Sequence, residues 1–165
     1  MADTLPDTAL LGIYLNDHLA GATAGTELAK RLAAAERGQR GEAVLSRLAE
    51  EVADDRAALL TCMAALEVPV RHYKTVAAWA GEKLGRLKPN GRLVSRSPLS
   101  AVEELELMRL GVEGKAAGWR TLRVRADADP RLDGGRLDDL IDRARRQIDE
   151  LEDLRVHATA AAFGG

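Results

Sequence analysis

Aromatic residues and cysteine are both scarce in this chain of 165 residues, and each scarcity excludes a class of protein. Aromatic side chains make up only 3% of the residues, so the apolar content of 46% comes mainly from aliphatic side chains and alanine. Sheets favour β-branched and aromatic residues, whereas closely packed helices accept leucine and alanine readily. The single cysteine, Cys62, excludes an internal disulfide and is typical of a reducing compartment. The composition therefore predicts an all-α protein of the cytoplasm.

Long apolar runs and a strong net charge are also missing. No apolar run reaches the ~20 residues that a membrane-spanning helix needs. The first residues lack the basic and apolar regions of a signal peptide. The formal net charge of −2 argues against a nucleic-acid-binding protein. At this length we expect a single domain over residues 1–165, with no membrane partner. The bias toward Ala, Arg, Gly and Leu is typical of a GC-rich bacterial genome.

What the sequence does have is helical periodicity in four long segments. Apolar residues recur at alternating spacings of three and four, which places them on one face of a helix. The predicted helices span residues 8–37, 41–67, 98–125 and 136–162. The link from Gly38 to Gly41 is too short for anything but an antiparallel neighbour. On the last helix, Asp139/Arg143, Asp142/Arg146 and Arg145/Asp149 have the i, i+4 spacing of ion pairs on a solvated surface.

A basic segment separates the second and third of these helices. Residues 70–97 carry a net charge of +6, so the rest of the chain carries −8. An apolar stripe predicts a short helix over residues 71–88 that lies against the bundle. Four residues before the next helix predict a small-anion site, because a helix N-terminus attracts phosphate or sulfate. These residues are Arg92, Ser95, Arg96 and Ser97. The alternative is that the basic segment docks on the negative bundle; nucleic-acid binding would require more interleaved aromatic residues.

The connectivity indicates a four-helix bundle with one long crossover. Two antiparallel hairpins joined by this segment place the third predicted helix parallel to the second, and the fourth parallel to the first. The chain thereby resembles the ferritin-like superfamily. That resemblance implies a di-iron site with a Glu from two helices and a Glu-x-x-His from each of the other two. This sequence instead has Glu51-Val-Ala-Asp54 and Glu150-Leu-Glu-Asp153. An alternative site for iron or another divalent metal would use Glu51, Asp54, Glu106, Asp153 and His157.

Three arginines, Arg56, Arg109 and Arg155, fall on or beside stripes that are otherwise apolar. A buried guanidinium needs a carboxylate, because an unpaired buried charge is costly. The carboxylates expected at similar heights are Glu51, Asp55 and Glu106. We predict a buried ion-pair network that fixes the register of the helices and occupies the space of a di-iron site. The alternative is a polar layer that binds an anionic ligand or a metal.

Two smaller patterns complete the sequence evidence. His18 and Cys62 are expected at similar positions along the bundle axis. They could form a metal-binding or redox pair, or they could be ordinary core residues. Gly111, Gly114 and Gly118 share one helix face, where a neighbouring helix from the same chain or a second copy can approach closely. We expect a homodimer.

The preferred hypothesis is a non-catalytic ferritin-like bundle that acts by oligomerisation or partner binding; the alternative is a carboxylate-bridged metal enzyme or storage protein.

Overall fold

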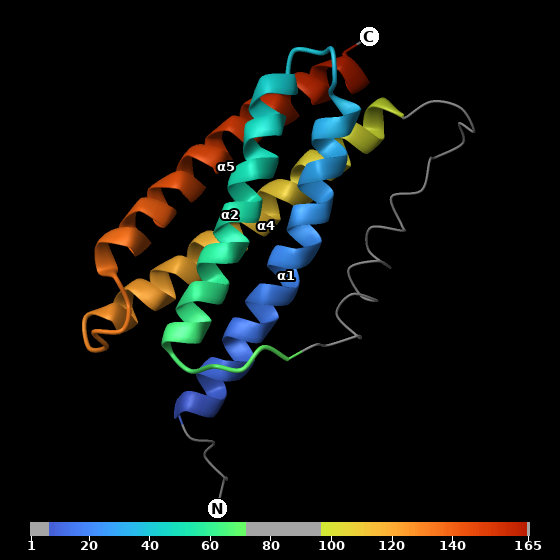
Figure 1. The fold of residues 1–165 in the computed structure, drawn as a ribbon. Coiled ribbons are helices and arrows are strands. Elements are labelled where there is room, and N and C mark those ends of the chain that lie inside the picture. Colours follow the sequence, from blue (N-terminus) through green and yellow to red (C-terminus); the bar gives the residue numbers. More distant parts are fainter. Residues whose placement is uncertain (1–6, 72–96, 165) are drawn as a thin grey trace, which may run out of the picture.

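The protein is seen here in a computed structural model that describes residues 7–71 and 97–164. Within those residues the chain forms four helices and no strand, which confirms the predicted all-α fold (Figure 1). The helices are α1 (Asp7–Ala35), α2 (Glu42–Ala65), α4 (Pro98–Ala126) and α5 (Gly134–Phe163). Each bound lies within two residues of the predicted one. The short helix predicted over residues 71–88 falls outside the described residues, apart from Arg71.

Local sequence explains where the helices begin and end. The Ser97 side chain accepts a hydrogen bond from the backbone N–H of Leu99 at the start of α4, and the Asp133 side chain accepts one from Arg136 at the start of α5. Such caps satisfy N–H groups that have no partner inside the helix. Gly38 adopts a φ of +74° just after α1, a conformation that glycine reaches without steric cost. The starts of α4 and α5 and the end of α1 are therefore specified by nearby residues.

The helices pack as a bundle in which α1 contacts α2 and α4, while α5 contacts α4 and α2. Helices α2 and α4 lie diagonally opposite each other, because no close backbone contact joins them. Figure 1 shows α1 and α5 running toward one end of the bundle and α2 and α4 running toward the other. Among the described residues, no helix combines the length and apolar character needed to cross a membrane.

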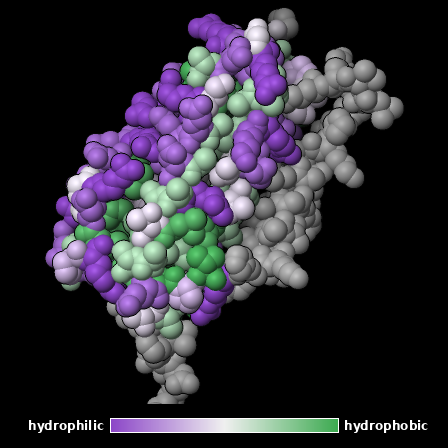
Figure 2. Space-filling view, in the orientation of Figure 1, coloured by the Kyte–Doolittle hydropathy of each residue, from purple (hydrophilic) through white to green (hydrophobic). Residues whose placement is uncertain are grey.

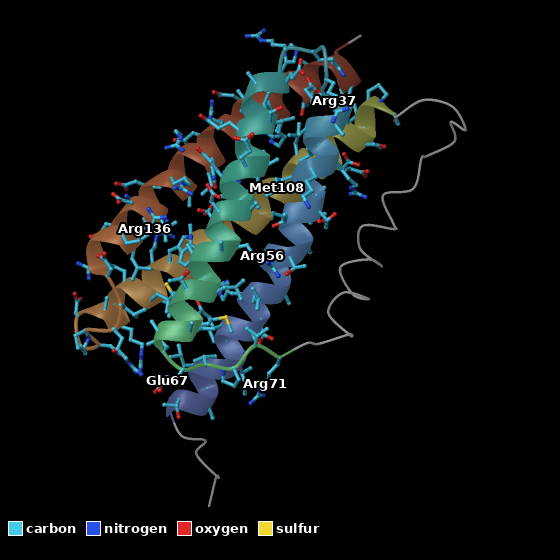
Figure 3. All side chains as sticks on the ribbon, in the orientation of Figure 1. Arg37, Arg56, Glu67, Arg71, Met108 and Arg136 are labelled. Atoms are coloured by element: carbon cyan, nitrogen blue, oxygen red, sulfur yellow. The ribbon has the colours of Figure 1, made fainter. Side chains whose placement is uncertain are left out.

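The two ends of the basic segment lie at opposite ends of the bundle. The Asn16 side chain donates to the carbonyl of Pro69 at 3.1 Å and accepts from the backbone N–H of Arg71 at 2.7 Å, which ties Arg71 to the first half of α1. Figure 3 shows Arg71 at the end of the bundle away from Arg37, which follows α1. Pro98, in contrast, lies close to the turn that joins α1 to α2, where it lines a pocket with Gly41.

The core consists of two apolar clusters along the bundle axis. The cluster nearer the α1–α2 turn includes Leu32, Leu48, Ala144 and Leu151. The cluster nearer the α4–α5 turn includes Leu15, Met63, Trp119 and Leu137. Burial of each large aliphatic side chain contributes about 1.5–3 kcal/mol. Figure 2 shows hydrophilic side chains over most of α5 and a hydrophobic patch toward the lower part of the α1–α2 face.

Candidate functional site

A buried polar layer lies between the two apolar clusters. Asp55 of α2 is only 2% exposed, and both of its carboxylate oxygens accept hydrogen bonds from cations. Lys115 Nζ of α4 lies 2.5 Å from one oxygen, and Arg143 Nη1 of α5 lies 2.9 Å from the other. Lys115 also donates to Gln147 at 2.6 Å, and Gln147 donates to Glu51 at 2.8 Å. One hydrogen-bonded network thus connects three helices.

The electrostatics of this layer follow from its burial. Burial lowers the pKa of Lys115 below its ordinary value, because the protein interior disfavours the charged form, while the charge and hydrogen bond of Asp55 oppose that shift. Burial works to raise the pKa of Glu51, but hydrogen bonds from Gln147 and Arg146 and the charge of Arg146 lower it overall. Arg146 Nη2 lies 2.6 Å from Glu51. The layer therefore holds three cations against two carboxylates.

The three arginines predicted for this layer lie elsewhere, whereas Glu51 and Asp55 do take part in it. Arg56 donates from Nε to the Thr23 hydroxyl at 3.0 Å. The carboxylates of α2 are instead met by Lys115 of α4 and by Arg143 and Arg146 of α5. Arg143 and Arg146, assigned to surface pairs with Asp139 and Asp142 on the sequence alone, supply that charge.

Arg109 and Arg155 belong to a second, exposed cluster around Glu152. Arg109 Nε lies 3.3 Å from Glu152, and Arg155 Nη2 lies 2.7 Å from it. Arg155 is also 3.6 Å from Glu106, another member of the predicted network, but the Glu106 side chain is 51% exposed rather than buried. The hydrogen bonds from Arg155 lower the pKa of Glu152. The Glu152 side chain remains 39% exposed, so water screens this cluster.

The alternative metal site is not assembled in the described part of the chain. No group of three or more His, Cys, Asp or Glu side chains there is arranged to hold a metal ion. Apart from Glu51, each residue of that set is exposed: Asp54, Glu106, Asp153 and His157. Of the four residues of the predicted anion site, only Ser97 is among the described residues, and its side chain caps α4. Arg92, Ser95 and Arg96 lie outside them, so the anion site stays a prediction.

A cavity of about 470 Å³ lies beside the polar layer, between α1, α2 and α4. Asp55 and Lys115 line it, and Arg56 and Met108 lie in the same middle region of the bundle (Figure 3). Most of its wall is apolar: Leu15, Ala22, Val52, Leu59, Met108, Val112, Trp119 and Leu122. Its volume falls within the range of about 300–1,000 Å³ that is usual for small-molecule sites.

Five glycines of α1 and α4 shape the mouth of this cavity: Gly21, Gly25, Gly111, Gly114 and Gly118. At Gly21, Gly111 and Gly114 an added Cβ would meet no atom of the described residues within 4 Å. At Gly118 it would lie 3.0 Å from the ring of His18, so the ring packs there only because the side chain is absent. Of the three glycines predicted to admit a neighbouring helix, Gly118 thus admits α1 of the same chain, and the other two leave open space.

Tyr14, His18 and Trp119 are the polar aromatic residues of the cavity wall. His18 packs edge-on against Tyr14, with ring centroids 4.5 Å apart. Burial lowers the pKa of His18, opposed by the charge of Asp17. Trp119 is 3% exposed, and its buried Nε1 has no hydrogen-bond partner in the described part of the chain. Cys62 is a half-buried thiol packed against the second core cluster, and burial raises its pKa, so it is poorly suited to form the reactive thiolate.

Sequence reasoning missed Lys115, Arg143 and Gln147. A signal for Gln147 was present, because it lies three residues from Ala144 and four from Leu151 on the apolar face of α5. Lys115 directly precedes the fully buried Ala116, which places it at the edge of the apolar face of α4. No such signal distinguishes Arg143 from the exposed arginines of α5.

No family model, curated protein or solved structure matches this chain.

Proposed function

We propose that this protein is a non-catalytic binding bundle whose cavity between α1, α2 and α4 takes a small molecule. The observation that carries the proposal is the open space at Gly21, Gly111 and Gly114. Glycine inside a helix costs roughly 0.5–1 kcal/mol relative to alanine. No neighbour among the described residues approaches these three exposed positions closely enough to require glycine. All three line the cavity, and glycine there adds no side chain that would cover it.

The buried polar layer is proposed to position the walls of this cavity. Each ionised group of the layer has an oppositely charged partner, and Asp55 has two. A satisfied network of this kind favours one arrangement of the helices over others. Lys115 and Asp55 therefore act mainly as structural residues that also form part of the cavity wall.

A neutral apolar probe tests the proposal. N-phenyl-1-naphthylamine fluoresces when it enters an apolar site, and we expect saturable binding to the full chain. The double substitution Gly21→Leu/Gly114→Leu adds side chains where space is open, and should weaken binding at least tenfold. The matched control Ala43→Leu/Ala117→Leu places the same side chains at two exposed helical positions outside the cavity. Equal binding by both variants would show that the probe occupies another surface.

The ferritin-like connectivity is part of the same proposal. Its support is that Arg71 and Pro98 lie at opposite ends of the bundle and that α2 and α4 run in the same direction (Figure 1). The sequence predicts a short helix over residues 71–88 within this connection. Backbone chemical shifts measured by NMR test it: helical values over those residues support the prediction, and random-coil values contradict it.

Self-association is the second candidate function, favoured by one uncharged stripe on α4. Its outward positions alternate at spacings of four and three: Leu110, Gly114, Ala117, Thr121 and Val124. Leu110 and Val124 are 64% and 74% exposed. A homodimer would cover them. Light scattering at micromolar concentration should give a dimer mass that Leu110→Lys/Val124→Lys reduces to the monomer; a monomer mass for the parent protein removes the dimer.

A further inference from the structure

The charged groups that line the cavity are not all paired with one another. Asp55 is already neutralised by Lys115, which lines the cavity, and by Arg143, which does not. Asp17 lies exposed at the rim, next to His18. The remaining charge of the lining is the guanidinium of Arg56.

Arg56 is the cation that this arrangement leaves unmatched. It lines the cavity from α2 and is only partly exposed. Its Nε donates to the neutral hydroxyl of Thr23, and no carboxylate of the described residues lies within 4 Å of it. The two terminal nitrogens of the guanidinium are left to bind another acceptor. Arginine presents these donors in a planar fork that matches a carboxylate or a sulfonate.

Two further donors line the same cavity. The indole Nε1 of Trp119 is buried without a partner, which is rare for a polar atom in a protein interior. Lys115 has three N–H donors, and its hydrogen bonds to Asp55 and Gln147 use two of them. Both side chains line a wall that is otherwise apolar, and Met108 and Val112 lie on the same helix. The cavity thus combines an apolar wall, a cation and unpaired donors.

We infer that the ligand of this cavity is a small organic anion, with an apolar ring system against Met108 and Val112 and its negative group on Arg56. The inference rests on the proposed function, because it names the chemical class that the same cavity takes. The indole N–H of Trp119 donates to an acceptor on the ring system. Within a wall of low polarity, one charge-assisted hydrogen bond accounts for about a tenfold preference for an anion over a neutral molecule of the same shape.

A matched pair of probes tests the sign of the ligand charge. 8-Anilinonaphthalene-1-sulfonate has the same ring system as N-phenyl-1-naphthylamine and adds one sulfonate. In the parent protein we expect the sulfonate to bind at least about tenfold more tightly. Arg56→Met should remove that difference, because the sulfonate loses its charged partner. The control Arg31→Met removes an equal charge from an exposed position of α1 and should change neither affinity.

Tryptophan emission provides the second readout. The chain has two tryptophans, so Trp79→Phe leaves Trp119 as the only indole. Bound sulfonate should quench its emission by energy transfer, and Gly21→Leu/Gly114→Leu should abolish the quenching. Equal affinities for the two probes, or an unchanged preference in Arg56→Met, would overturn the inference while leaving a binding cavity. Failure of both probes to bind would overturn the proposed function as well.

Discussion

Asp55 and Glu152 are each a carboxylate between two cations, yet their surroundings differ completely. Asp55 lies between Lys115 and Arg143, and Glu152 lies between Arg109 and Arg155. The exposed fraction of the side chain is 2% for Asp55 and 39% for Glu152. Because water screens exposed charges, similar distances have different energetic consequences. The comparison teaches that the depth of an ion pair, rather than the number of its partners, determines how much the fold depends on it.

Asp55→Asn should have the largest effect. The substitution leaves two partly buried cations, Lys115 and Arg143, facing a neutral amide. Breaking a buried pair in this way costs about 3–5 kcal/mol. Urea unfolding followed by circular dichroism measures the loss, provided that the transition is two-state. A loss below about 1 kcal/mol would contradict the assignment of Asp55 as the centre of the layer.

Lys115→Met should have the next largest effect, because Asp55 keeps Arg143 as its partner. The loss of two hydrogen bonds is expected to cost about 1–3 kcal/mol. The pH dependence separates this role from simple packing. The folded-state pKa of Lys115 lies below its ordinary value of 10.5, so the folded protein binds fewer protons between the two values.

In the parent protein, the free energy of unfolding attributable to Lys115 should therefore rise with pH from the folded-state pKa up to 10.5. Lys115→Met lacks this increase. The contributions of the remaining lysines to the free energy of unfolding are the same in both proteins, so they cancel when one profile is subtracted from the other. The measurement is urea unfolding of both proteins at several alkaline pH values. Parallel pH profiles would show that the ammonium is not buried as the structure has it.

Gly114→Ala should produce a smaller change of opposite sign. The added methyl group meets no neighbour, so the helix gains about 0.5–1 kcal/mol of stability. Gly118→Ala is the matched comparison on the same helix, because its methyl group would press on the ring of His18 at 3.0 Å. We expect the second variant to melt below the first. Equal melting temperatures would show that His18 moves aside freely.

Glu152→Gln should have the smallest effect of the set. Its arginine partners remain accessible to water, where hydration replaces the lost ion pairs. We expect the urea midpoint to change little, and any change to shrink further in 0.5 M NaCl. A loss comparable to that of Asp55→Asn would remove the distinction between the two clusters.

The fold was predictable from the sequence because helix periodicity and end signals are local. Ser97-Pro98 and Gly38 specify their helix ends within a few residues of chain. The polar layer was not predictable in the same way, since its composition depends on which helices are neighbours in the bundle and which lie diagonally opposite each other. Lys115 and Arg143 come from helices whose order around the axis no local pattern encodes. The cavity was missed because the sequence does not distinguish a glycine that packs against a neighbouring helix from one, such as Gly21 or Gly114, that does not.

The residues of the Asp55 network come from both helical hairpins, α1–α2 and α4–α5, and this has a consequence for folding kinetics. Helices α1 and α2 are joined by a short turn, as are α4 and α5, so each pair forms mainly local contacts. Asp55 belongs to the first pair, while Lys115 and Arg143 belong to the second. Their bonds form only when the pairs dock, which we expect to be the late event because it brings together residues far apart in the sequence. Asp55→Asn should therefore accelerate unfolding far more than it slows folding.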